Sequence, residues 1–225
     1  MTQLSGDAAG APDPRADESL VPGWLAILVL LLLLAIVGVG GFVLRGIVEA
    51  NLSTDPRSAE VARWERAVSA TPADANARLS LAYALQKAGR TDEAIKEYDT
   101  VLKADPKNTA ALYNTGVIYM ARGESRKAEA WWWRALDAEP THALAAKSLG
   151  DYYSGLGHYR SVVKAVRPAV QAKPSLADLQ YLMGVAYENL GRSDWARERY
   201  ALALRYAPDM SKASEGLKRV GGETP

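Results

Sequence analysis

The feature that most constrains the fold is a period of 34 residues that fills most of the chain after residue 57. Proline and glycine both follow this interval, in two separate columns. The columns are Pro72, Pro106, Pro140, Pro174 and Pro208, and Gly89, Gly123, Gly157 and Gly191. A period held by independent columns is typical of a stacked repeat architecture, in which each unit covers the apolar face of its neighbour.

Within one period the residues predict a helical hairpin. Gly89 is suited to end a first helix, because a helix terminus favours the left-handed conformation that glycine adopts without cost. Ala94, Tyr98 and Leu102 then recur at four-residue intervals, which indicates a second amphipathic helix. Pro106 ends that helix, because proline lacks the amide hydrogen and clashes with the preceding turn. Small residues in the column of Ala82, Gly116, Gly150 and Gly184 allow the two helices to approach closely.

The pattern resembles the tetratricopeptide repeat family, whose units have small, glycine, aromatic and proline positions in this order. The resemblance covers Arg57 to about Val220, and its signature is clearest in "TGVIY" (115–119), "LGDYY" (149–153) and "MGVAY" (183–187). It implies an all-α fold, an α-α superhelical solenoid that binds other proteins. The tryptophan often found early in each family unit is replaced here, and Pro168 inside a second helix predicts a kink or a shortened helix.

The repeats and the flanking composition divide the chain into segments. We expect a disordered acidic tail (1–20), a transmembrane helix (21–45), a juxtamembrane helix or linker (46–56), an N-terminal half repeat (57–74), four units (75–108, 109–142, 143–176 and 177–210), and a capping helix with a tail (211–225).

The transmembrane prediction rests on Trp24–Leu44, which has 21 residues and no charge. As a helix this segment would be roughly 31 Å long, the thickness of a bilayer's hydrocarbon core. A cleaved signal peptide is the alternative, but the apolar run is long and the preceding stretch is acidic rather than basic. The pattern therefore predicts a single-pass, membrane-anchored bacterial type of protein. Arginines after the span favour cytoplasmic repeats, whereas anchors near the N-terminus more often export the domain that follows; we expect the extracytoplasmic side.

Composition excludes several classes of function. The formal net charge of +1 argues against nucleic acid as a partner, because phosphate backbones require a concentrated basic face. The chain has no cysteine, and neither His142 nor His158 has partners at metal-ligand spacing. The sequence contains no catalytic or nucleotide-binding motif. We therefore expect no enzyme activity, no metal and no cofactor.

The resemblance implies that the first helix of each unit lines a concave groove for a peptide or a helix. A carboxylate clamp is not expected, because only Asn114 fits the lysine and asparagine positions that such a clamp requires. The candidate groove residues are Tyr83, Gln86, Tyr113, Val117, Met120, Lys147, Asp151, Tyr181 and Val185.

Three consecutive tryptophans form a second candidate surface. On a helix they fan over about 200°, more than a core-facing stripe covers. Trp132 shares its column with apolar and aromatic residues and is expected in the core. Trp131 and Trp133 share columns with mostly charged residues, so together with Trp195 they are predicted to form an exposed contact patch for a partner, a second copy or the bilayer. Local packing is the alternative.

Three functions fit these patterns. The first is a membrane-anchored scaffold or adaptor that mediates protein-protein interaction. The second is an envelope assembly factor or chaperone, for example in cytochrome c maturation or secretion. The third is a self-associating structural subunit of a membrane complex. The sequence does not name the partner.

Overall fold

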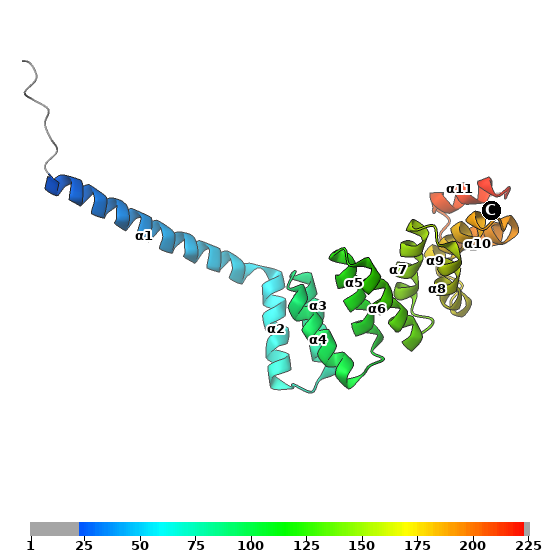
Figure 1. Cartoon of the computed structure of the whole chain (residues 1–225), viewed down its shortest axis with the longest axis horizontal. Coiled ribbons are helices and arrows are strands. Elements are labelled where there is room, and N and C mark those ends of the chain that lie inside the picture. The colour runs from blue at the N-terminus through cyan, green and yellow to red at the C-terminus, as the bar shows by residue number, and fades with distance from the viewer. Residues whose placement is uncertain (1–22, 223–225) are drawn as a thin grey trace, which may run out of the picture. The chain divides into compact units, whose positions relative to one another are not determined.

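The computed structural model describes residues 23–222, apart from the side chains of Gly23, Ala26 and residues 44–54. This part of the chain is helical without strands, and it forms two compact units that divide between Asp55 and Pro56 (Figure 1). The first unit contains α1 (Gly23–Thr54). The second contains α2 (Pro56–Ala70), α3 (Ala75–Lys87), α4 (Thr91–Ala104), α5 (Thr109–Ala121), α6 (Ser125–Ala138), α7 (Ala143–Gly155), α8 (Tyr159–Ala172), α9 (Ala177–Asn189), α10 (Ser193–Tyr206) and α11 (Ser211–Arg219).

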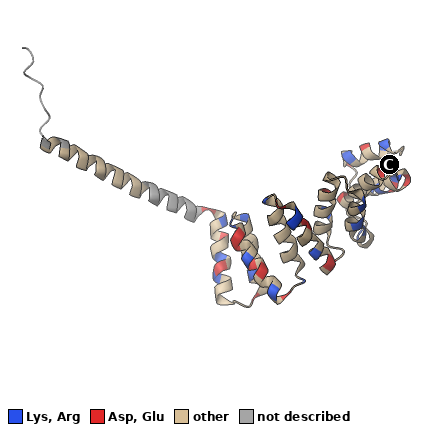
Figure 2. Cartoon of the chain, in the orientation of Figure 1, with Lys and Arg blue, Asp and Glu red and all other residues tan. Residues whose placement is uncertain are grey.

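Helix α1 differs from the others in its side chains. The described part of α1 carries no Lys, Arg, Asp or Glu (Figure 2), and large apolar residues such as Trp24, Leu31 and Phe42 are exposed along it. Among the described residues, however, no helix is both long enough and apolar enough to cross a bilayer, so the transmembrane helix predicted over 21–45 is not supported. The helix continues through residues 46–54, where a juxtamembrane helix or linker was predicted. The predicted tail, 1–20, lies outside the described residues.

The second unit is a row of helix pairs: α3 with α4, α5 with α6, α7 with α8, and α9 with α10. Each pair is joined by a short turn whose glycine has φ between 70° and 79°. Only glycine adopts this backbone readily, and the turn ends the first helix and reverses the chain. The all-α solenoid expected from the 34-residue period is therefore confirmed.

In two of the pairs, a glycine of the first helix lies against a large aromatic side chain of the second. Gly116 faces Trp132, and Gly184 faces Tyr200; both rings are buried. A Cβ on Gly116 would lie 2.5 Å from Nε1 of Trp132, and one on Gly184 would lie 2.6 Å from the Tyr200 ring. Trp132 is thus a core residue, as its column predicts, and the small column exists because the ring occupies its space.

Pro168 does not shorten its helix, so that part of the prediction is wrong. Helix α8 has 14 residues, the same length as α4, α6 and α10, with Pro168 inside it. Pro168 has no amide hydrogen to donate to the carbonyl of Lys164. Helix α8 nevertheless buries Val162, Val166 and Val170 on both sides of Pro168 in the sequence. This packing is worth more than the single backbone hydrogen bond that proline removes.

The first helices lie on the inner face of the row. Helices α3 and α5, α7 and α9, and α9 and α11 pack directly on one another, whereas successive second helices approach less closely. We use the term inner face for the surface of α3, α5, α7 and α9, and outer face for that of α4, α6, α8 and α10. Helix α11 covers the end of the row by burying Ala213 and Leu217.

We predict that Gly116→Ala destabilises the second unit by about 1–3 kcal/mol, because the new methyl group has to displace the buried Trp132 ring. The measurement is urea unfolding followed by far-UV circular dichroism. Gly155→Ala is the control: its Cβ would meet nothing within 4 Å, so it is expected to stabilise α7 by roughly 0.5–1 kcal/mol. Equal effects of the two substitutions would contradict the close contact between Gly116 and Trp132.

Candidate functional site

The candidate groove residues all lie on the inner face, on α3, α5, α7 and α9. Tyr83 and Asp151 are exposed, and Tyr83 has 48% of its surface accessible. The other seven are half-buried, so each presents part of its side chain to solvent and part to the core. These seven are Gln86, Tyr113, Val117, Met120, Lys147, Tyr181 and Val185.

Several of these side chains are already held by neighbours. The Oε1 of Gln86 accepts a 3.0 Å hydrogen bond from the buried Tyr98 hydroxyl. Tyr113 packs against the ring of His142, with 5.5 Å between ring centroids. Lys147 donates to Asp151 at 2.7 Å, and this hydrogen bond raises the pKa of Lys147. The inner face is therefore ordered before any partner binds.

A cavity of about 330 Å³ lies at the N-terminal ends of α7 and α9, and we call it the apolar cavity. Leu144 is 56% exposed at the cavity, and Lys147 and Asp178 supply its charged groups. Of the candidate groove residues, the cavity includes Lys147 alone. Its lining is Ala143, Leu144, Lys147, Ser175, Leu176, Ala177, Asp178, Leu179, Ala207 and Met210.

Two of the lining residues, Leu176 and Met210, occupy the position that caps the first helix in other repeats. Asp74 accepts hydrogen bonds from the backbone amides of Asn76 and Ala77, and Asn108 accepts one from Ala111. His142 caps α7 in the same way, through Nδ1.

Leu176 and Met210 precede α9 and α11 and make no side-chain cap. Replacing a capping side chain by an apolar one costs a helix about 0.5–2 kcal/mol, and Leu176 and Met210 pack half-buried against the core instead. Leu176 and Met210 were not among the site residues predicted from the sequence. The 34-residue column that begins at Asp74 and includes His142 does show the change from polar to apolar residues.

Models of known protein families match the repeat region of the chain. One tetratricopeptide repeat model matches residues 55–108 and 79–143, and a second matches 177–210. The chain belongs to the tetratricopeptide repeat family. The matched residues leave out 144–176, the unit that contains Pro168. A search of curated proteins gave no match.

Solved structures of tetratricopeptide repeat proteins share the fold. A crystal structure of MamA is 25% identical, covers 65% of this chain and 80% of that chain, and has a TM-score of 0.56. MamA from Desulfovibrio magneticus RS-1, residues 41 to the end, is 20% identical over 65% of this chain and 82% of that chain, with a TM-score of 0.55. YrrB, described as a TPR protein with an unusual peptide-binding site, is 20% identical over 70% of this chain and 81% of that chain, with a TM-score of 0.60.

The three tryptophans of the predicted exposed patch do not share one surface. Trp131 is half-buried, stacked on Tyr119 of its own repeat, with Arg134 4.2 Å from its ring centroid. Trp133 is half-buried on the other side of α6, where its Nε1 donates to the Tyr153 hydroxyl at 2.8 Å.

The next repeat thus takes up the space in which Trp133 was predicted to meet solvent. Trp195 is 47% exposed and packs edge-on against Tyr187, so the predicted patch narrows to this one residue. The charged residues in the columns of Trp131 and Trp133 predicted exposure for both. The large indole rings instead reach neighbouring side chains and pack against them.

Catalytic or metal chemistry has little support in the site. Within residues 23–222, no group of three or more His, Cys, Asp or Glu is placed to hold a metal ion. The pKa of Tyr153 is raised to about 12, mainly by burial and by its hydrogen bond to Glu129, so this hydroxyl is less acidic than that of an ordinary tyrosine.

The inner face ends at Glu188 of α9, which accepts hydrogen bonds from the Tyr200 hydroxyl and from Nε of Arg219 at 2.7 Å. Hydrogen bonding to Arg219 lowers the pKa of Glu188, so this carboxylate stabilises the folded repeat above the unfolded pKa of about 4.3. The stabilisation is lost as the pH falls through the lower, folded pKa. The contact thus joins α11 to the last repeat only while Glu188 is ionised.

We predict that Glu188→Gln lowers the free energy of unfolding at pH 7 and removes part of the loss that the wild-type protein shows between pH 5 and pH 3. Urea unfolding at a series of pH values measures both effects. Glu215→Gln, at an exposed position of α11, is the control and should leave the pH profile unchanged. A profile for Glu188→Gln that overlays the wild-type profile would contradict the role of this contact.

Proposed function

We propose that this protein is a scaffold that holds a partner peptide or helix on its inner face, with one apolar side chain of the partner inserted into the apolar cavity. Tetratricopeptide repeats are protein-protein interaction modules, and YrrB shows that this fold can carry a peptide-binding site. The observation that carries the proposal is that apolar Leu176 and Met210 stand before α9 and α11, where other repeats have a capping side chain.

The surroundings of the cavity favour this kind of occupant. Leu144 supplies exposed apolar surface at the cavity, so a partner side chain gains from burying both itself and Leu144. Lys147 and Asp178 provide opposite charges at the same cavity, which can orient the polar backbone or termini of a peptide. Tyr113, Val117, Tyr181 and Val185 extend the half-buried surface along α5 and α9. The contact is one apolar anchor with a polar rim.

We predict that Leu144→Glu weakens partner binding at least tenfold, because it places an unpaired charge where the apolar anchor is buried. The partner is first identified by site-specific photo-crosslinking from position 144 in cells, followed by mass spectrometry. The purified partner segment is then titrated against the full-length variants by fluorescence anisotropy.

Leu156→Glu is the matched control, because Leu156 is a similarly exposed leucine (49%) that follows the C-terminal end of the same helix α7. It should bind like the wild type. The proposal fails if both variants bind equally well, or if crosslinks form from position 156 and not from 144.

We also propose that the apolar segment Trp24–Leu44 anchors the protein in a lipid bilayer. The proposal rests on the sequence, where 21 consecutive residues carry no charge. Exposed leucine, isoleucine and valine side chains along α1 require a cover, because apolar surface in water is unfavourable. We place the repeats on the extracytoplasmic side in this proposal, because anchors near the N-terminus more often export the domain that follows.

We predict that the full-length protein remains with membranes in alkaline carbonate, and that the double substitution Leu32→Arg/Leu33→Arg releases it by making insertion unfavourable. Leu156→Arg is the control and should stay with the membranes. Release of the wild-type protein would overturn the anchor.

The side of the membrane on which the repeats lie can be tested by labelling one introduced cysteine, because the chain has no cysteine of its own. A single Ser211→Cys substitution places a thiol at an exposed residue of the last helix. Labelling of intact cells by a membrane-impermeant maleimide is expected for extracytoplasmic repeats. Labelling only after lysis would place the repeats in the cytoplasm.

A further inference from the structure

The outer face carries a cleft of different chemistry between α8 and α10, beside the last two repeats. Two cavities of about 280 Å³ each open there, and they share Arg167 and Tyr187 as lining residues. Four arginines line them: Arg160 and Arg167 from α8, Arg192 from the turn before α10, and Arg199 from α10. We call this the arginine cleft.

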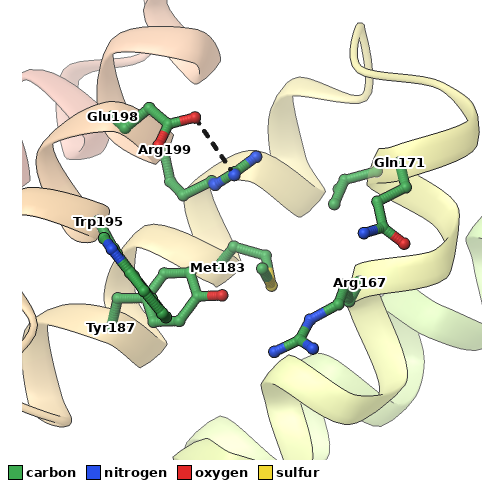
Figure 3. Close-up of a pocket in the computed structure, with 8 residues that line it drawn as sticks. Arg167, Gln171, Met183, Tyr187, Trp195, Glu198 and Arg199 are labelled. Carbon is green, nitrogen blue, oxygen red and sulfur yellow. Dashed lines mark ion pairs between the residues drawn. The ribbon is translucent and has the colours of Figure 1, made fainter.

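The arginines of the cleft have few partners. Within the part of the chain that the structure describes, the side chains of Arg160, Arg167 and Arg192 make no hydrogen bond or ion pair; Arg192 lies 4.6 Å from the centroid of the Trp195 ring. Arg199 pairs with Glu198 at 3.3 Å and donates a 3.3 Å hydrogen bond to Oε1 of Gln180, and its Nε is buried without a hydrogen-bond partner. Figure 3 shows Arg167 and Arg199 extending from the two facing helices into one cavity. Four arginines thus line two adjoining cavities that contain one carboxylate, that of Glu198.

The other repeats act as an internal control for this arrangement. Two repeats earlier, the positions equivalent to Arg160, Arg167, Arg192 and Arg199 are Asp92, Asp99, Glu124 and Trp131. Two of these acids are paired there, Asp92 with Arg122 at 2.7 Å and Glu124 with Lys127. Helix α8 has three basic residues and no acidic one. The repeat architecture therefore does not require arginine at these four positions.

Like charges gathered without counter-charges repel one another, and an oxyanion relieves that repulsion. Guanidinium groups bind carboxylate and phosphate oxygens through paired N–H donors, and the guanidinium groups of the exposed Arg160, Arg167 and Arg192 are open to such bonds. Tyr187 and Trp195 add aromatic surface beside the arginines. A recessed cleft between two helices suits side chains that enter it singly, more than it suits a flat lipid surface.

We propose that the arginine cleft binds an acidic peptide segment of a partner protein through its oxyanion side chains. This site is separate from the inner face and goes beyond the function proposed for it. The protein would then hold two chains, or two parts of one chain, on opposite faces of the same row of repeats.

The test is fluorescence anisotropy with a fluorescein-labelled peptide of six glutamates, titrated with the full-length protein in a neutral detergent. We expect saturable binding that weakens as salt is raised and that Arg160→Gln/Arg167→Gln weakens at least tenfold, since charge-assisted hydrogen bonds are lost. Both arginines are exposed, so the fold should be kept, and circular dichroism checks this. Arg205→Gln/Lys212→Gln removes the same charge from exposed residues outside the cleft and should bind like the wild type.

Three results would overturn the proposal: no binding of the glutamate peptide at low salt, equal binding of a labelled lysine peptide, or equal loss in both double variants. Competition separates the sources of the oxyanion. Displacement by an unlabelled glutamate peptide supports a peptide ligand. Binding of inorganic phosphate without any binding of the peptide assigns the cleft to a free anion and overturns it. The Leu144→Glu variant should bind the glutamate peptide normally, so failure of this proposal and of the inner-face proposal are distinguishable.

Discussion

The structure depends on the close approach of the two helices of a repeat, where a side chain of the second helix fills the space left by a small residue of the first. Trp132 against Gly116 and Tyr200 against Gly184 show it most closely, and Tyr200 also packs on Gly216 of α11. The contact sets the distance between the helices of a pair, so all other positions follow from it. It also explains why α8 tolerates Pro168: the buried valines of that helix maintain the pairing when a backbone hydrogen bond is lost.

Because the core is confined to a few columns, the remaining columns are free to differ between repeats. The column before the first helix changes from capping residues (Asp74, Asn108 and His142) to Leu176 and Met210. The column of Asp92 changes to Arg160, and that of Asp99 to Arg167. The first change removes the helix caps of α9 and α11; the second gathers basic residues on α8, although the column of Asp92 is already basic at Arg126 in the second repeat. Binding of a partner is the role that we propose for both changes.

The sequence predicted the parts of the fold that every repeat shares. The period, the glycine turns and the buried position of Trp132 follow from residue types that recur at a fixed interval, so a single chain contains its own comparison. What could not be predicted depends on how one side chain meets a particular neighbour. Trp133 was predicted to be exposed because its column is charged, yet its indole reaches Tyr153 of the next repeat. The apolar cavity was missed because it combines helix starts with the loops at Leu176 and Met210, which are far apart in sequence. The groove residues were placed on the correct helices, but their family positions did not reveal that Gln86 and Lys147 are already bonded within the protein.

The position of the two candidate sites follows from the geometry of the row. On the inner face, first helices pack on one another, so a partner there meets a continuous surface whose hollows lie at the helix ends. On the outer face, second helices stand further apart, so clefts form between them with first-helix residues such as Met183 and Tyr187 at the base. An apolar anchor is therefore favoured at an inner helix end, where Leu176 and Met210 replace polar caps by apolar lining. Charged recognition is favoured in an outer cleft, where long arginine side chains can extend from both walls. A row of similar helix pairs can in this way hold two chemically different partners without any change in the contact that keeps each pair together.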